Sequence, residues 1–185
     1  MLSAYHRSKQ LRSRERSDTL LKEKEEELLR ISELDGYKTE QLSKIAVLGV
    51  ADNRHVQGHK DLFSKILGHA VDIHTFDITT EHLLGEAQVY AQDVTEAIPY
   101  GPYDIVYSHV LLKFIPKEKQ MRVIDNSVAA LKHGGIAIHV FGIGPRYKEN
   151  DPTVKEIQAH CEKNGLPCNF IKTSKGGTAV LVMKK

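Results

Sequence analysis

Along most of the chain, hydrophobic patterns typical of strands alternate with patterns typical of helices, as in a wound α/β domain. A short apolar run over 45–50 is followed within a few residues by a helical pattern, which is typical of a buried strand that leads through a loop into a helix. Further strands are predicted over 71–77, 87–91, 103–107 and 136–141. In such sheets a ligand binds outside the carboxyl ends of the strands, so the loop after the first strand is the first place to look for a site.

The C-terminal part of the chain breaks this alternation of strand and helix. Two strands, over 169–173 and 178–183, are joined only by Ser-Lys-Gly-Gly. So short a connection permits only an antiparallel hairpin, because a parallel pair needs a crossover of about a dozen residues. Before it, Gly134-Gly135 is predicted to end one helix and Asp151 to cap the next. The predicted fold class is α/β: a Rossmann-like, doubly wound sheet of about seven strands, mostly parallel with a C-terminal antiparallel hairpin, and with helices on both faces.

Residues 1–43 differ in composition and are predicted to form an N-terminal helical extension to a domain over 44–185. Basic residues dominate the first sixteen positions and acidic residues follow. A broken apolar stripe predicts one or two helices from about 17 to 34, ended by Asp35-Gly36, with a disordered extreme N-terminus. Two interpretations stay open, a helix across the sheet edge with a solvated charged face and a basic arm that touches RNA or a partner. The amphipathic extension also favours a homodimer or a partner protein held through these helices.

The composition is that of an ordinary soluble globular protein. Of its 185 residues, 41% are hydrophobic and 27% charged, and the net charge of +2 is too small to argue for nucleic acid. The two cysteines, Cys161 and Cys168, have neither a metal-binding spacing nor a disulfide framework, which favours a reducing compartment. No apolar run has membrane-spanning length and no signal peptide is evident, so we expect no membrane partner and a cytoplasmic location.

Three segments, in the right order and spacing, resemble a known family. Gln-Asp-Val-Thr-Glu-Ala-Ile-Pro occupies 92–99, Tyr-Asp-Ile-Val-Tyr-Ser-His-Val-Leu-Leu follows at 103–112, and Ala-Leu-Lys-His-Gly-Gly occupies 130–135. With the terminal hairpin, this pattern resembles the class I S-adenosylmethionine-dependent methyltransferases. The resemblance covers about 44–185. It implies S-adenosylmethionine as cofactor and transfer of its methyl group to an acceptor, with a small molecule, a protein side chain and RNA all left open.

The resemblance also implies roles for individual residues. Asp77, at the end of the second strand, would accept hydrogen bonds from the two ribose hydroxyls, for which a carboxylate has two acceptor oxygens. Asp93 would meet the adenine amino group, with Val94 beside the ring. Ser108 and His109 would lie near the methyl donor, and His109 is the candidate general base, since a neutral imidazole can take a proton from the acceptor.

The first loop departs from the family pattern. An acidic residue late in the strand falls on Gly49, and the glycines of Gly-x-Gly-x-Gly fall on Ala51, Asn53 and His55. Ala51 is small and Asn53 tolerates the left-handed region, while Asp52 is a candidate replacement for the acid. Gly49, Ala51, Asp52 and Asn53 are therefore the predicted cofactor loop. The departure supports an alternative function: a non-catalytic protein of this fold that acts as a binding or regulatory subunit.

Two further groups of residues are candidates for a metal site and for a substrate-facing loop. His55, His59 and Asp61 could ligate a metal, but a helix that starts at Gly58 would separate the imidazoles, which favours solvated or capping histidines. We therefore predict no metal site. Arg146 and Tyr147 stand where the substrate-facing loop of the family would be, and ordinary surface residues are the favoured interpretation.

Overall fold

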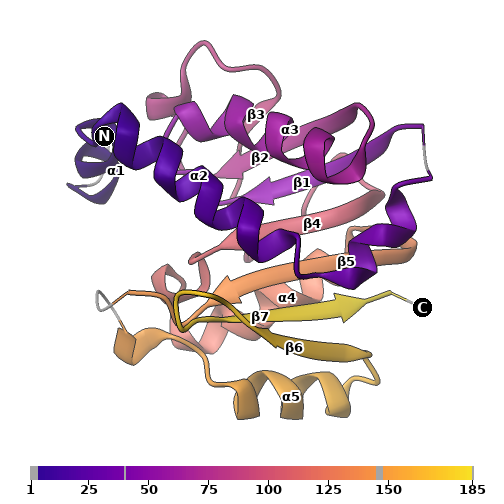
Figure 1. Ribbon diagram of the computed structural model, residues 1–185. Coiled ribbons are helices and arrows are strands. Elements are labelled where there is room, and N and C mark those ends of the chain that lie inside the picture. Colours follow the sequence, from indigo (N-terminus) through magenta and orange to yellow (C-terminus); the bar gives the residue numbers. More distant parts are fainter. Residues whose placement is uncertain (1–3, 40, 145–147, 185) are drawn as a thin grey trace. The chain divides into compact units, whose positions relative to one another are not determined.

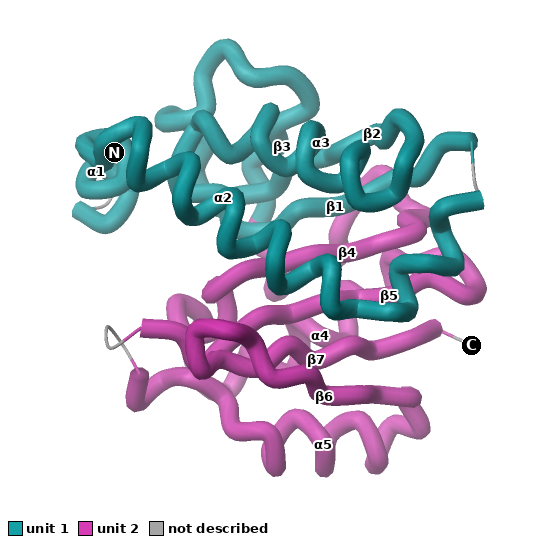
Figure 2. The backbone as a smooth tube through the Cα atoms, viewed as in Figure 1, with its two compact units in different colours: residues 1–92 teal, residues 93–185 magenta. Residues whose placement is uncertain are grey.

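The computed structural model describes residues 4–39, 41–144 and 148–184. The chain divides into two compact units, residues 1–92 and 93–185 (Figure 2). Within the described ranges, no helix combines the length and the apolar character needed to cross a membrane.

The first unit holds three parallel strands preceded by the N-terminal helices (Figure 1). Its elements are α1 (Ala4–Gln10), α2 (Arg14–Leu28), the 3-10 helix η1 (Ser32–Tyr37), β1 (Ser43–Leu48), α3 (Arg54–Leu67), β2 (Val71–Asp77), η2 (Glu81–Leu83) and β3 (Val89–Ala91). The predicted second strand is confirmed with its bounds, and β1 pairs with it in parallel from Ser43 opposite Val71 to Leu48 opposite Phe76. The core includes the apolar residues of β1 and β2, the inner face of α3, and Leu28 and Leu34 from the N-terminal helices.

The N-terminal extension is more structured than predicted. Residues 4–10 form helix α1, where disorder was expected for the extreme N-terminus; residues 1–3 lie outside the described part. The one or two helices expected over about 17–34 are α2, which begins three residues earlier, and η1, which extends past Asp35-Gly36 to Tyr37. The expected solvated charged face is present on α2, where Arg14, Lys22 and Glu26 are exposed, but Lys24 and Glu27 are buried in the part of the chain where α2 packs against α3.

The second unit carries the remaining strands and the terminal hairpin. Its elements are β4 (Tyr103–His109), η3 (Leu112–Phe114), η4 (Lys117–Lys119), α4 (Gln120–Ala129), β5 (Leu131–Phe141), η5 (Lys148–Asn150), α5 (Val154–Lys163), β6 (Cys168–Lys172) and β7 (Thr178–Met183). Strands β4 and β5 are parallel, whereas β7 is antiparallel to both β5 and β6. The predicted hairpin is therefore confirmed.

Two predicted helix boundaries in this unit are wrong. Gly134-Gly135 lies inside β5, near the point where the register with β4 shifts, and α4 has already ended at Ala129. A Cβ atom on Gly135 would lie 3.0 Å from the backbone oxygen of Tyr103, so this glycine permits a close strand approach. Helix α5 is capped by Thr153 in a capping box, not by Asp151, whose carboxylate instead accepts from the backbone N–H of Gly142.

The strands form one seven-stranded sheet in the order β3-β2-β1-β4-β5-β7-β6. The order of a doubly wound sheet is 3-2-1-4-5-6, and here an antiparallel strand, β7, is inserted between β5 and β6. The predicted fold class, a mostly parallel Rossmann-like sheet with an antiparallel C-terminal hairpin, is confirmed.

Candidate functional site

The loop after β1 begins with a left-handed glycine, and the chain's own N-terminal helix contacts this loop. Gly49 has φ +74°, a left-handed conformation that favours glycine, and its N–H donates to the oxygen of Phe76. The carbonyl oxygen of Ala51 accepts a hydrogen bond of 3.1 Å from the side-chain amide of Gln10. Asn53 is the residue before α3 and makes no capping bond with its side chain. Helix α1 therefore lies against the loop for which the sequence predicts cofactor binding.

Asp52, the candidate substitute for the missing acid, is buried and surrounded by donors from the same chain. Arg54 donates to both of its carboxylate oxygens at 2.8 and 2.9 Å, and Ser17 Oγ donates at 3.2 Å. Arg12 lies 3.7 Å away. Burial opposes ionisation, but the hydrogen bonds and charge of Arg54, together with the electrostatic effect of His55, lower the pKa of Asp52. This carboxylate fastens α2 and the start of α3 to the loop.

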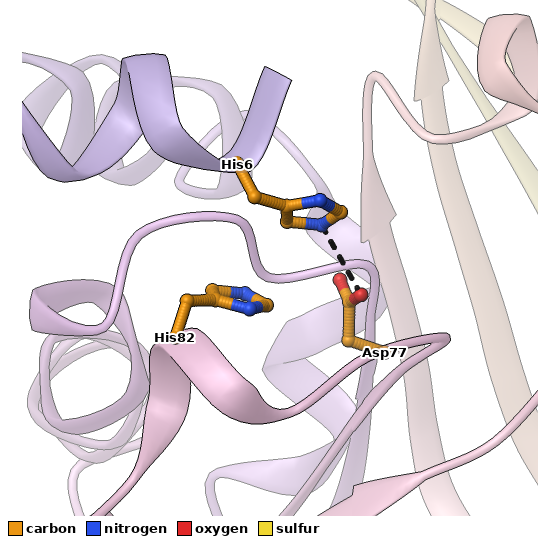
Figure 3. Close-up of side chains that lie close together, drawn as sticks. All are labelled: His6, Asp77 and His82. Atoms are coloured by element: carbon orange, nitrogen blue, oxygen red, sulfur yellow. Dashed lines mark ion pairs between the residues drawn. The ribbon is translucent and has the colours of Figure 1, made fainter. Parts of the chain in front are cut away.

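Asp77 lies at the carboxyl end of β2, as the sequence predicts for a ribose-binding carboxylate, and is 6% exposed. His6 of α1 approaches it with Nε2 3.3 Å from Oδ1, and the N–H of Thr79 donates to the same oxygen (Figure 3). Burial raises the pKa of Asp77 and lowers that of His6. His82 of η2 completes a group of three buried side chains whose ligand atoms all lie within 4.8 Å of one another.

The two histidines weighed as metal ligands have another role. Helix α3 begins at Arg54, not at Gly58, so His55 and His59 lie one turn apart on the same buried face. The Nζ atom of Lys24 stands between them, 3.3 Å from Nδ1 of His55 and 2.9 Å from Nε2 of His59. They are neither solvated nor capping, and an amine fills the place that a metal would need.

Asp93 and Val94 open the second unit. The carboxylate of Asp93 accepts hydrogen bonds from the N–H and the hydroxyl of Thr95 at 2.9 and 2.8 Å, which lower its pKa, while the residue itself stays exposed. Val94 is buried, and its carbonyl oxygen accepts from the side-chain amide of Asn126. Asp93 is therefore an ionised acceptor at the surface of this unit.

The carboxyl end of β4 separates its two predicted site residues. Ser108 is fully buried, and its hydroxyl lies 2.8 Å from Nδ1 of His139 on β5, so it is a core residue of this unit. His109 is only half-buried. Burial lowers the pKa of His139 to about 4. Arg146 and Tyr147 lie outside the described residues.

Sequence reasoning missed the residues that contact the predicted ones. His6, Gln10, Ser17 and Lys24 all come from the N-terminal helices and reach the first loop, Asp77 or α3. The only signal in the sequence was the unusual density of polar residues on helices that still carry an apolar stripe. Nothing local indicated which loop they would contact.

Comparison with known proteins supports the fold. No protein-family model and no curated protein sequence matches the chain. Solved structures do match: a SAM-dependent methyltransferase from Aquifex aeolicus is 12% identical with a TM-score of 0.61, covering 90% of this chain and 98% of that one. The N-methyltransferase NodS from Bradyrhizobium japonicum, in complex with S-adenosyl-L-homocysteine, is 12% identical (TM-score 0.62; 96% and 94% covered). The plantazolicin methyltransferase BpumL, also in complex with S-adenosylhomocysteine, is 10% identical (0.66; 92% and 87%). At these identities the likeness establishes the fold, that of class I S-adenosylmethionine-dependent methyltransferases.

Proposed function

We propose that the protein is an S-adenosylmethionine-dependent methyltransferase. The observation that carries this proposal is Asp77: a buried carboxylate at the carboxyl end of the second strand, in a fold whose solved examples include complexes with S-adenosylhomocysteine. The left-handed Gly49 adds a backbone turn suited to close approach of a ligand. The residues of the first unit therefore fit the cofactor, on the condition that His6 gives up its contact with Asp77.

Each unit contributes separate groups to this proposal. On the first, Asp77 would accept hydrogen bonds from the ribose hydroxyls, and the loop from Gly49 to Asn53 would lie against the cofactor. On the second, the ionised carboxylate of Asp93 would accept from the adenine amino group. When bound, S-adenosylmethionine supplies an electrophilic methyl group on a sulfonium. His109 would take the proton from the acceptor, whose identity we leave open.

The alternative is a non-catalytic protein of the same fold, and one observation favours it. His6 contacts the carboxylate of Asp77, and the side chain of Gln10 donates a hydrogen bond to the carbonyl oxygen of Ala51. Helix α1 therefore contacts two of the groups that a cofactor would use. A protein whose N-terminal helix never leaves these groups would serve as a binding or regulatory subunit.

Calorimetric titration of S-adenosylmethionine and S-adenosylhomocysteine separates the two functions. We expect the wild-type protein to bind, and Asp77→Ala to lose at least about tenfold in affinity, the equivalent of roughly 1.4 kcal/mol for a lost charged hydrogen bond. Asp72→Ala is the matched control, because Asp72 lies on the same strand and should leave binding unchanged. His6→Ala should strengthen binding, since it frees the carboxylate. An absence of binding by both the wild type and His6→Ala would refute the methyltransferase proposal and favour the non-catalytic function.

A further inference from the structure

Three side chains from separate segments of the first unit converge beside the first loop. His6 comes from α1, Asp77 ends β2 and His82 lies in η2, and Figure 3 shows the two imidazoles and the carboxylate pointing toward one another. All three are buried, with exposed fractions of 9%, 6% and 7%. Their ligand atoms lie within 4.8 Å of one another, and the centroids of the two imidazole rings are 4.5 Å apart. Two nitrogens and one oxygen are thus held close together away from solvent.

The hydrogen bond of His82 determines which of its two ring nitrogens keeps a lone pair. Its Nε2 atom lies 2.8 Å from the carbonyl oxygen of Val50. A carbonyl only accepts, so Nε2 carries the proton, and in a neutral ring Nδ1 is then left with its lone pair. That Nδ1 atom is buried and has no hydrogen-bond partner among the described residues. Buried polar atoms are rarely left unsatisfied, so this lone pair calls for a ligand.

Comparison with the other buried histidine pair of this unit shows what is missing. Between His55 and His59 the amine of Lys24 donates to both rings. At Asp77, by contrast, no lysine or arginine in the described ranges forms an ion pair, and the group that approaches the carboxylate is the imidazole of His6. Asp77 and Nδ1 of His82 thus offer lone pairs that no lysine or arginine of the described ranges engages, which is the chemistry of a cation site.

We propose that His6, Asp77 and His82 bind one Zn²⁺ ion. Two imidazole nitrogens and a carboxylate oxygen are donors that zinc accepts in proteins, usually in tetrahedral geometry with a fourth position open to water or a substrate. Bonds of about 2.0–2.2 Å place tetrahedral ligand atoms roughly 3.3–3.6 Å apart. His6 Nε2 and Asp77 Oδ1 already have that separation, 3.3 Å. Nδ1 of His82, whose ring is held through Nε2 by Val50, would supply the third donor.

The surroundings of the group match those of protein zinc sites. A ligating histidine commonly donates its other N–H to a backbone carbonyl, which orients the ring, and Val50 provides that carbonyl for His82. Asp77 is likewise held by the N–H of Thr79, 3.2 Å from Oδ1. The proposal does not depend on the methyltransferase function. Because both use Asp77, zinc and S-adenosylmethionine are expected to compete when both are present.

The test uses the full-length protein, stripped with EDTA and titrated with ZnCl₂ by calorimetry and with CoCl₂ by visible absorption. We expect one equivalent of metal to bind and the cobalt form to show the intense bands of tetrahedral coordination. His6→Ala and His82→Ala should each weaken binding by more than about 100-fold, beyond the roughly 10- to 100-fold cost of losing an outer hydrogen-bond partner. His74→Ala is the matched control, because His74 is equally buried in the same unit but outside the group.

Two outcomes would overturn the proposal. One is a stripped wild-type protein that takes up neither metal at millimolar concentration. The other is equal binding by the wild type and the His6 and His82 variants, which would assign the metal to surface histidines. Should His82→Ala fail to fold by circular dichroism, His6→Ala and His6→Gln decide, since His6 lies on the short helix α1 and not in the sheet. Neither result depends on whether the protein binds S-adenosylmethionine.

Discussion

The buried amine of Lys24 provides the sharpest prediction. Burial, and to a smaller extent the charge of Arg12, lowers its pKa from 10.5 to about 7. A neutral amine has two hydrogens, and the structure offers two acceptors for them, Nδ1 of His55 and Nε2 of His59. Nδ1 is the acceptor on His55 because Nε2 of that ring lies 3.3 Å from the carbonyl oxygen of Ser17 and donates to it. The folded protein therefore favours uncharged Lys24.

The sign of the pH dependence follows from this lowered pKa. Between about pH 7 and pH 10.5 the unfolded chain keeps a proton on Lys24 that the folded chain has lost, so the free energy of unfolding rises with pH. Where the unfolded chain holds one whole proton more than the folded chain, the free energy of unfolding rises by about 1.4 kcal/mol per pH unit. Since Lys24 is half titrated in the folded state near pH 7, we expect a gain of roughly 1.5 kcal/mol between about pH 7 and 8.5.

Lys24→Met removes the amine with little change in side-chain length. It leaves two buried imidazole nitrogens without donors, each at a cost of about 1–3 kcal/mol, and it also removes the cost of burying the amine. We expect the variant to be less stable by about 2 kcal/mol near pH 8.5, and the difference to shrink by roughly 1.5 kcal/mol near pH 7. Urea unfolding followed by circular dichroism at several pH values measures both quantities.

The pH window ends near 8.5 for a physical reason. Burial raises the pKa of the Cys161 thiol from 9.0 to about 12, so at higher pH the unfolded chain loses a proton that the folded chain keeps, and stability falls. The effect of Cys161 is the same in the wild type and in Lys24→Met, so it cancels in the difference between their free energies of unfolding. Parallel stability curves for the wild type and Lys24→Met would refute the reasoning, because the slope would then come from another group.

Two other substitutions test the second unit. Ser108→Ala leaves Nδ1 of buried His139 without a partner and should lower the free energy of unfolding in urea by about 1–3 kcal/mol. An unchanged urea midpoint in the variant would contradict the contact. Because the pKa of His139 is lowered to about 4, the wild type should also lose stability as the pH falls from about 6.5 toward 4. Gly177→Ala would place a Cβ atom 2.8 Å from the backbone oxygen of Phe141, which should lower the free energy of thermal unfolding by about 1–3 kcal/mol. The control is Gly36→Ala, whose Cβ atom meets no atom within 4 Å and should change that free energy by no more than about 0.5 kcal/mol. Equal effects of the two substitutions would argue against crowding at Gly177.

Much of the fold could be predicted because its strands are short apolar runs between strong turn signals. Val71–Asp77 matches the structure at both ends, and the four-residue turn before Thr178 left an antiparallel hairpin as the one geometry available. The N-terminal helices were harder to predict. Helix α2 packs through Lys24 and Glu27 as well as Leu28, and charged residues count against burial in any hydrophobic pattern.

Of the candidate site, only Asp77 could be predicted from the sequence. Asp77 follows an apolar strand, and the order of strands indicates that its carboxylate comes at a sheet end where ligands bind. The contact of His6 with that carboxylate joins segments far apart in the sequence, and no local pattern specifies such a pairing. Likewise, His82 becomes a candidate ligand only once its hydrogen bond to Val50 shows which nitrogen is free to face the group.

The dependence of the N-terminal helices on later segments has a consequence for the order of folding. Gln10, Ser17 and His6 find their buried partners in the loop after β1 and at the end of β2. On the ribosome, α1 and α2 are made before any of those partners exist, and contacts between distant segments must overcome the entropy of closing the intervening chain. We expect these helices to dock only after β1, α3 and β2 have assembled. The part of this chain that is synthesised first is then among the last to be buried.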